Sequence, residues 1–188
     1  MRHTILILFA GLLLTLTVSC DNWLDVRPQT EVKVDDNFKT AQGFKDAISG
    51  IYLLMSDKAI YGQELSFGML DVLGKQYTTP FSVSGRYYDI SRYDYTTEQA
   101  KGIIDPIWSK MYNVIANVNS LIEHIDKADQ TMFSGVEYNV IRGEAYALRA
   151  FLHFDLVRLF GPSYKTGAST KAIPYEETFD NKITELST

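Results

Sequence analysis

Apolar residues recur at helical spacing in three segments of this chain, and the pattern predicts an all-α fold. The first segment is Thr40–Met55, in which Thr40 is placed to cap the helix. The second covers about Asp105–Ala128, and the third about Gly135–Phe160. Only the short stretch Asp129–Ser134 joins the last two segments, so we expect them to form an antiparallel helical hairpin.

The ends of the two longer helices carry start and stop signals. Asp105 followed by Pro106 suits a helix start, because proline is favoured at the first helical position, where its missing N–H is not needed. Gly161 and Pro162 end the third helix sharply.

Two further features of the pattern concern packing. Gly43 and Gly50 each weaken the first helix by about 1 kcal/mol relative to alanine, and we expect Gly50 to permit close approach of another helix. The third helix is apolar on two faces, which is typical of a helix buried between neighbours. One face holds Ile141, Ala145, Leu148, Leu152, Leu156 and Leu159, and the other holds Val140, Ala147, Phe151 and Phe154.

Between the first two helices the pattern is irregular. Glycines and Pro80 interrupt it, and only Leu65–Leu73 suggests a short helix. Gln76–Tyr95 reads as a long polar loop with a short strand or two, in which Tyr93 and Tyr95 alternate with charged residues as in a half-buried strand. Long irregular loops in compact domains are often functional.

The N-terminus differs from the rest of the chain. A basic start precedes the uncharged apolar run Thr4–Leu16, which is short for a bilayer span but suits a signal peptide over residues 1–19. Thr17, Ser19 and Cys20 then resemble the lipobox of bacterial lipoproteins, in which the cysteine is acylated and becomes the new N-terminus. Cys20 is the only cysteine, so it has no internal disulfide partner. The alternative is an ordinary signal peptide with an incidental cysteine.

Composition narrows the possible classes of protein. The chain is 46% hydrophobic and 13% aromatic, which favours a packed domain over residues 20–188. The net charge of −5 and the absence of basic blocks argue against nucleic acid as a partner. Residues 165–188 hold turn formers and then the start of another element, so we expect a partial domain that is truncated at its C-terminus.

Catalytic and metal-binding patterns are weak. The chain has no G-x-S-x-G, H-E-x-x-H or Walker motif, and nothing selects a carboxylate pair for glycoside hydrolysis. His124 and His153 lack metal-ligand spacing and read as surface or packing residues. We therefore expect a binding protein that is not an enzyme and uses no metal and no cofactor.

Aromatic residues in the polar loop are the candidates for ligand contact. Phe81, Tyr87 and Tyr88 lie near serines and Arg86, and such rings can stack on the apolar face of a sugar whose hydroxyls need polar partners. The alternative is that these rings only cover the helical core. Trp108 lies on an apolar stripe and is expected in the core.

Charged residues on the third helix are expected to form structural ion pairs and to clamp the helices together, because an isolated buried charge is costly. They are Glu144, Arg149, Asp155 and Arg158.

The third helix and its end, from Ile141-Arg142-Gly143-Glu144-Ala145 to Phe160-Gly161-Pro162, resemble the N-terminal region of the SusD/RagB family of Bacteroidetes lipoproteins. Other segments resemble the same family in order and spacing. They are the lipobox with Cys20, Leu24-Asp25-Val26 with Pro28, the helix Phe38–Tyr52, and the set Trp108, Tyr112, Ile115, Ala116, Asn117 and Asn119.

The resemblance implies a scaffold of tetratricopeptide-like helix pairs, and a repeat of about 34 residues suits the spacing of the two longer helices. It also implies a lipid-anchored, surface-exposed outer-membrane protein that binds oligosaccharides or peptides. Such proteins pass nutrients to a SusC-like TonB-dependent transporter and do not catalyse. The alternative is a helical-repeat interaction module, or a truncated relic, that docks on a partner without binding glycan.

Overall fold

The computed structural model describes residues 34–77, 82–167, 169–180 and 185–187. The chain divides into two compact units, Met1–Val34 and Asp35–Thr188, and the second contains all the described residues except Val34. The predicted signal peptide, Cys20 and Phe81 lie outside the described residues.

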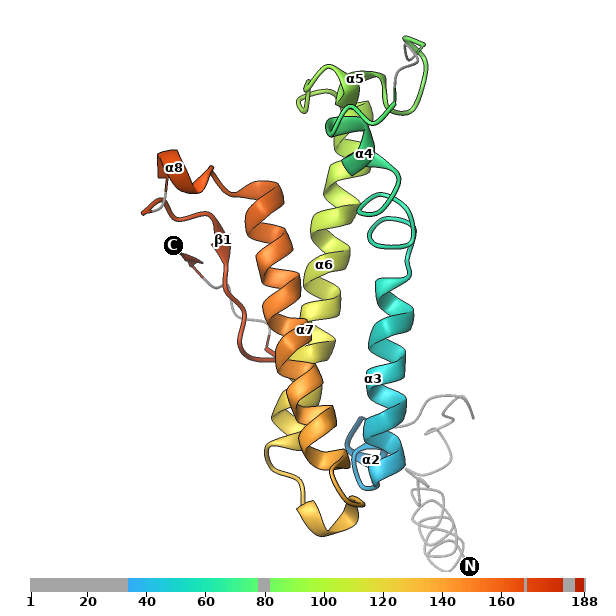
Figure 1. Ribbon diagram of the computed structural model, residues 1–188, viewed down its shortest axis with the longest axis vertical. Helices are drawn as coiled ribbons and strands as arrows, with labels where there is room; N and C mark the ends of the chain where they lie inside the picture. Colours follow the sequence, from blue (N-terminus) through green and yellow to red (C-terminus); the bar gives the residue numbers. More distant parts are fainter. Residues whose placement is uncertain (1–33, 78–81, 168, 181–184, 188) are drawn as a thin grey trace, which may run out of the picture. The chain divides into compact units, whose positions relative to one another are not determined.

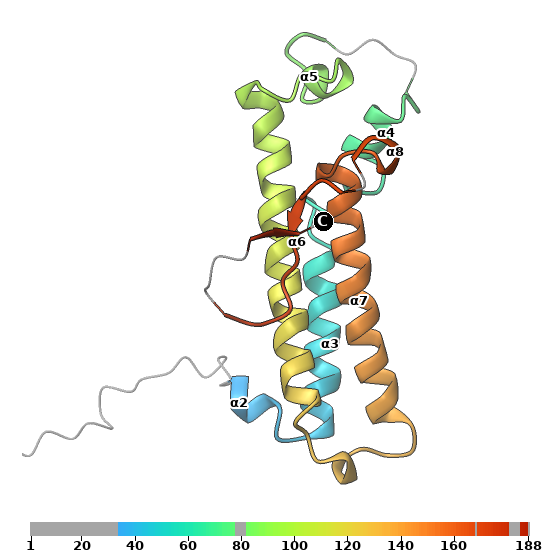
Figure 2. The same cartoon turned by 90° about the vertical axis from the view of Figure 1, so that its left-hand side faces the viewer.

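Three long helices form the second unit. Helix α3 (Ala41–Met55), α6 (Glu98–Ile125) and α7 (Glu137–Phe160) lie side by side (Figures 1 and 2). Helices α6 and α7 run antiparallel and are joined by a turn that contains the 3-10 helix η2 (Gln130–Met132). The predicted all-α class and helical hairpin are confirmed.

Helix α6 supplies most of the core. Its buried stripe packs between α3 and α7, whose own apolar faces meet it. Burying each large side chain of this kind contributes about 1.5–3 kcal/mol. The buried residues of α6 are Ala100, Ile103, Ile107, Met111, Val114, Ile115, Val118, Asn119, Ser120, Leu121, Ile122 and Ile125. Trp108 packs against this core, as expected, with its ring centroid 4.9 Å from that of Phe160.

The predicted start of α6 at Asp105 is wrong. The helix begins seven residues earlier, at Glu98, and Thr97 is its N-cap, accepting a hydrogen bond from the Ala100 amide. Pro106 therefore lies inside the helix. The reason is that the apolar stripe continues upstream of the proline through Ile103, so burial outweighs the lost backbone hydrogen bond.

The shorter helices lie near the ends of the three long ones, and two short strands pair beside α7. They are α2 (Val34–Asn37), α4 (Met69–Leu73), α5 (Tyr88–Ser91) and α8 (Tyr164–Gly167), with strands β1 (Ile173–Pro174) and β2 (Leu186–Ser187). The strands pair antiparallel, with Ile173 opposite Ser187 and Pro174 opposite Leu186.

The predicted strand around Tyr93 and Tyr95 is wrong, because both side chains are exposed and Tyr93 has a positive φ of 61°. A turn occupies the segment instead, closed by hydrogen bonds from Arg92 and Asp94 to the Asp89 carbonyl. The short helix predicted at Leu65–Leu73 is confirmed only over Met69–Leu73.

Helix α7 buries one apolar face and exposes the other. Ile141, Ala145, Leu148, Leu152 and Leu156 are buried, as predicted. The second face stays largely exposed in the described part of the chain, although the Tyr61 ring packs against Phe151 with 5.4 Å between the ring centroids. Its exposed residues are Val140, Ala147, Phe151 and Phe154.

The charged residues of α7 connect it to other elements. Asp155 pairs with Arg158 at 3.1 Å and accepts a hydrogen bond from the Tyr61 hydroxyl at 2.9 Å. Glu144 accepts a hydrogen bond from the Tyr52 hydroxyl of α3. The expected ion pair is present between Asp155 and Arg158 within α7, whereas the contacts of Asp155 and Glu144 to other elements are hydrogen bonds from tyrosine hydroxyls and not ion pairs.

The segment Ala172–Thr178, which we call the strap, lies along the α6–α7 hairpin (Figure 2). Side chains of both helices hold it by its backbone. The Tyr112 hydroxyl donates to the Pro174 carbonyl at 2.8 Å, and the Asn119 amide donates to the Glu176 carbonyl at 3.0 Å. Arg149 donates to the Glu177 carbonyl at 3.2 Å. These bonds fix the path of the strap through its backbone, while the buried Ile173 side chain and the Tyr175 ring, 4.3 Å from that of His153, add side-chain contacts.

His153 completes this contact from a buried position. Its Nε2 accepts a hydrogen bond from the Glu176 amide at 3.0 Å, so the ring proton is on Nδ1, which lies 2.9 Å from the Arg149 carbonyl. Burial lowers the pKa of His153 below its ordinary value of 6.5. Arg149 opposes a second positive charge, whereas the carboxylates of Glu176 and Glu177 favour it. The structure thus holds the neutral imidazole.

The close packing that was expected at Gly50 of α3 occurs at Gly43 instead. A Cβ on Gly50 would meet no atom within 4 Å, so Gly50 makes no close helix contact. A Cβ on Gly43 would lie 1.6 Å from the Asn37 carbonyl oxygen. Asn37 also donates its side-chain amide to the Gly43 carbonyl at 3.1 Å, so the chain before α3 folds tightly onto this glycine.

We predict opposite effects of alanine at these two positions. Gly43→Ala should lower the free energy of unfolding by about 2 kcal/mol, because the chain before α3 must move away. Gly50→Ala should raise it by about 1 kcal/mol, because alanine is the better helix former at an exposed site. Urea unfolding followed by circular dichroism measures both. Equal effects of the two substitutions would show that Gly43 has no special packing role.

The strap should loosen in acid. Since the folded state disfavours protonated His153, stability is full above about pH 6.5 and falls as the pH decreases through the lower folded-state pKa. We expect wild-type stability to drop between about pH 7.5 and about pH 5.5 more steeply than that of His153→Gln, which cannot titrate. Urea unfolding at both pH values gives the difference. Hydrogen exchange of the Glu176 amide should show lower protection at the acidic pH. Parallel pH profiles of the two proteins would rule out His153 as the titrating group.

Candidate functional site

The turn that follows α3 folds compactly against the start of α6. Ile60 is fully buried and anchors the turn in the core. Asp57 accepts a hydrogen bond from the Ala59 amide at 2.8 Å and forms an ion pair with Lys110 of α6, also at 2.8 Å. The Lys110 ammonium is the main reason that the pKa of Asp57 lies below its ordinary value. The turn is therefore tied to α6 by both apolar and ionic contacts.

A buried carboxylate organises the next part of the turn. The side chain of Glu64 is only 2% exposed. It accepts hydrogen bonds from the Met69 amide at 3.1 Å, from the Tyr87 hydroxyl at 3.1 Å and from Arg86 Nη2 at 2.9 Å. Three donors, one of them cationic, offset the desolvation of the charge. Gly68 is required here, since a Cβ would lie 2.8 Å from Glu64 Oε2.

A cavity of about 500 Å³ opens beside this carboxylate. The turn, the loop before α5 and the first half of α6 all contribute to its wall. Its lining residues are Asp57, Lys58, Ala59, Gln63, Glu64, Arg86, Gly102, Ile103 and Pro106. The volume is within the range of about 300–1,000 Å³ that is usual for small-ligand sites.

The cavity combines an apolar floor with polar walls. Ile103, Pro106 and Ala59 supply apolar surface, whereas Lys58 and Arg86 supply cations and Gln63 a neutral amide. The Glu64 carboxylate raises the pKa of Arg86 above its ordinary value and fixes one edge of the guanidinium. Such a mixture suits a ligand with both C–H faces and hydroxyl groups.

Tyr87, one of the residues predicted to contact ligand, lies behind this wall. Its hydroxyl donates to Glu64 and accepts a hydrogen bond from Gln63 Nε2 at 2.9 Å, so it positions two lining side chains. Tyr88 lies in α5, half-buried, with the Arg92 guanidinium carbon 5.5 Å from its ring centroid. The structure thus brings Tyr87 to the cavity but places Tyr88 elsewhere, and Phe81 is outside the described residues.

Sequence reasoning missed Lys58, Gln63 and Glu64 as members of a site. One available signal was Glu64, a single acidic residue between the apolar positions Ile60 and Leu65. A carboxylate buried in such a place needs cationic or amide partners, and those partners come from a distant part of the chain.

Two kinds of feature are absent from the described residues. No group of three or more His, Cys, Asp and Glu side chains in this part of the chain could hold a metal ion. Among the helices of the described segments, none is both long and apolar enough to cross a membrane.

Comparison with known proteins gives consistent matches. Residues 22–185 match the SusD-like family model described as "Starch-binding associating with outer membrane". The chain is 31% identical over 160 residues to SusD-like protein P2 of Formosa agariphila, covering 82% of this chain and 29% of that protein. It is 27% identical over 143 residues to SusD-like protein P38 of the same organism, covering 76% of this chain and 26% of the relative. The chain thus spans less than a third of the length of these relatives, and no solved structure matches it.

Proposed function

The chain belongs to the SusD-like family, and we propose that it binds oligosaccharides as part of an outer-membrane lipoprotein that passes them to a SusC-like TonB-dependent transporter. The observation that carries the proposal is the family match over residues 22–185, which includes the turn, the loop and all three long helices. The family description refers to starch binding and to association with the outer membrane.

We propose the 500 Å³ cavity as the binding site for a sugar unit. Lys58 and Arg86 can donate hydrogen bonds to hydroxyl oxygens, and Gln63 can both donate and accept. The apolar floor at Ile103 and Pro106 can lie against the C–H face of the ring. Tyr87 then acts by positioning Gln63, whereas direct ligand contact by Tyr88 and Phe81 remains a prediction.

The state of the carboxylates supports binding without catalysis. Glycoside hydrolysis needs a pair of carboxyl groups placed on either side of the scissile bond. In this cavity Glu64 already accepts three hydrogen bonds, and Asp57 is held by Lys110 and the Ala59 amide. Both carboxylates therefore serve the wall of the cavity.

The N-terminal sequence supports anchoring by lipid. We propose that residues 1–19 are removed as a signal peptide and that Cys20 is acylated, so that the protein is displayed on the outer membrane. Two or more acyl chains on one residue give a stable anchor, whereas one chain binds a membrane only marginally.

A second function has one observation in its favour. The exposed apolar face of α7, which includes Val140 and Phe151, suits a protein contact. A module that only docks on a partner through this face would bind no glycan.

Glycan binding is tested by affinity electrophoresis of the complete chain in gels that contain soluble starch, xylan, laminarin or mannan. We expect at least one polysaccharide to retard the wild-type protein. Lys58→Ala and Arg86→Lys should weaken that binding by about tenfold, the effect of losing one hydrogen bond to a charged group.

Lys127→Ala is the matched control, because this exposed lysine follows the end of α6, pairs with Glu123 of that helix and lies outside the cavity. It should be retarded as strongly as the wild type. Wild-type migration that no polysaccharide alters would contradict the proposed function and favour the docking module.

The anchor is tested separately in cells. Cys20→Ala should move the protein from the membrane fraction to the soluble fraction, and metabolic labelling with a fatty-acid analogue should disappear. Cys20→Ser serves as a second variant with nearly the same side-chain volume. Continued membrane association and labelling of both variants would refute lipidation at Cys20.

A further inference from the structure

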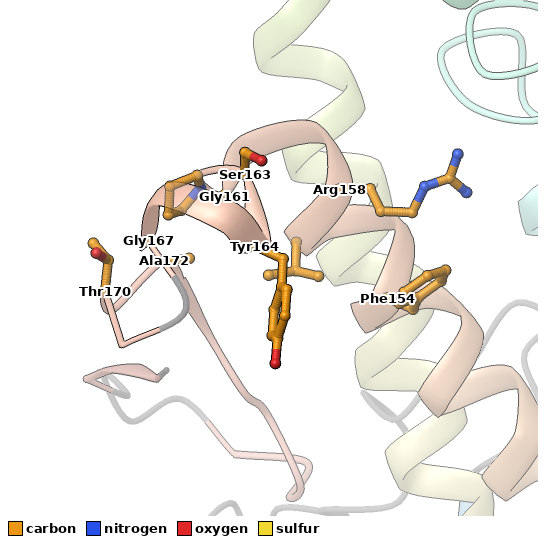
Figure 3. A pocket seen from close by; sticks show the side chains of 10 residues that line it. Phe154, Arg158, Gly161, Ser163, Tyr164, Gly167, Thr170 and Ala172 are labelled. Atoms are coloured by element: carbon orange, nitrogen blue, oxygen red, sulfur yellow. The ribbon is translucent and has the colours of Figure 1, made fainter.

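A second hollow, of about 620 Å³, lies where α7 ends and the chain turns through α8 towards the strap. Figure 3 shows the Tyr164 ring between Phe154 and Arg158 of α7 on one side and Thr170 and Ala172 on the other. None of these residues lines the cavity beside Glu64.

We propose that this hollow is a second glycan subsite, which takes one pyranose unit of the same oligosaccharide. The inference rests on the proposed function, because it assigns to the hollow the same class of ligand. It adds a site from a different part of the chain, with an aromatic platform that the first cavity lacks.

The aromatic rings are the first argument. Tyr164 is 86% exposed and Phe154 is 59% exposed, although both line a concave surface. Large aromatic side chains gain free energy when a ligand removes their faces from water. A pyranose ring presents an apolar C–H face that fits such a platform and keeps its hydroxyls at the rim.

The polar groups at the rim are the second argument. The Arg158 guanidinium carbon lies 5.5 Å from the Phe154 ring centroid, so hydrogen-bond donors stand directly beside an aromatic face. Asp155 holds Nη1 of this arginine at 3.1 Å, and the remaining donors are on a side chain that is 64% exposed. The hydroxyls of Ser163 and Thr170 can each donate and accept. These groups match sugar hydroxyls better than they match an apolar protein surface.

The walls of the hollow are already built, which is the third argument. Gly161 ends α7 with its amide bonded to the Val157 carbonyl at 2.9 Å, and a Cβ there would lie 2.5 Å from the same oxygen. The Ala172 amide donates a hydrogen bond to the Ser187 carbonyl at 2.8 Å, and the rest of the strap is hydrogen-bonded to the helices. Ordering the wall therefore takes little of the binding free energy.

The two cavities are linked through one turn. Tyr61, two residues before Gln63 of the first cavity, donates its hydroxyl to Asp155, the partner of Arg158 in the second. Burial and the Asp155 charge raise the pKa of Tyr61, so this hydroxyl stays protonated and the bond is retained. Both sites therefore lie at the same end of α7, as one extended glycan chain requires.

The test uses the polysaccharide gels described above, with each polysaccharide at graded concentrations. Tyr164→Ala and Phe154→Ala should each raise the Kd for a retarding polysaccharide about 3- to 10-fold, the effect of losing one aromatic contact. Phe179→Ala is the matched control, because Phe179 is 55% exposed and lines neither cavity. Circular dichroism of the three variants checks that the helices are intact.

The outcomes separate this inference from the proposed function. Loss of affinity in the Tyr164 and Phe154 variants, with the control unchanged, supports the second subsite. If these variants bind like Phe179→Ala while Lys58→Ala is impaired, the second subsite is refuted and glycan binding stands. If these substitutions leave the Kd unchanged but alter the sedimentation coefficient of the protein in analytical ultracentrifugation, the hollow is a protein contact and the subsite is also refuted. If no gel retards the wild type, glycan binding itself is refuted, and the second subsite is refuted with it.

Discussion

Burial of one continuous apolar stripe on α6 is the constraint on which the rest of the structure depends. The stripe runs from Ala100 to Ile125 and is covered by α3 on one side and α7 on the other. It sets the length of α6, because the buried stripe continues on the N-terminal side of Pro106 and the helix therefore begins only after its cap at Thr97. It also brings the turn after α3 and the strap to opposite surfaces of the same helix, at Lys110 and Tyr112.

Polar contacts then place the irregular segments on this scaffold. Glu64 gathers the turn, the start of α4 and the loop before α5 around one buried charge. The strap is held differently, through its backbone, by side chains that include Asn119, Arg149 and His153. Both sets of hydrogen bonds act together with a buried apolar anchor, Ile60 in the turn and Ile173 in the strap, and both segments border a hollow. A rigid helical frame with loops pinned at one end is a common design for ligand binding.

The two hollows differ in chemistry in a way that suits one polyhydroxylated chain. The first has charged walls over a small apolar floor, and the second has exposed rings with one arginine at the rim. The hydrogen bond from Tyr61 to Asp155 connects them structurally. The exposed second face of α7 adjoins the second hollow at Phe154, and its other exposed apolar residues, Val140 and Phe151, suit a protein neighbour.

The sequence by itself determined the three helices, their antiparallel hairpin, the cap at Thr40 and the family resemblance, because helical periodicity and capping are local properties of the chain. Tertiary structure decided the start of α6, since continued burial of Ile103 overrides the local signal of Pro106. It also decided that Gly43, and not Gly50, needs to be glycine, because the clash involves the Asn37 backbone. The cavity residues Lys58, Gln63 and Glu64, and the pairing of Phe154 with Tyr164, became visible only in three dimensions. Their roles come from contacts between segments far apart in sequence, and such contacts leave no periodic pattern along the chain.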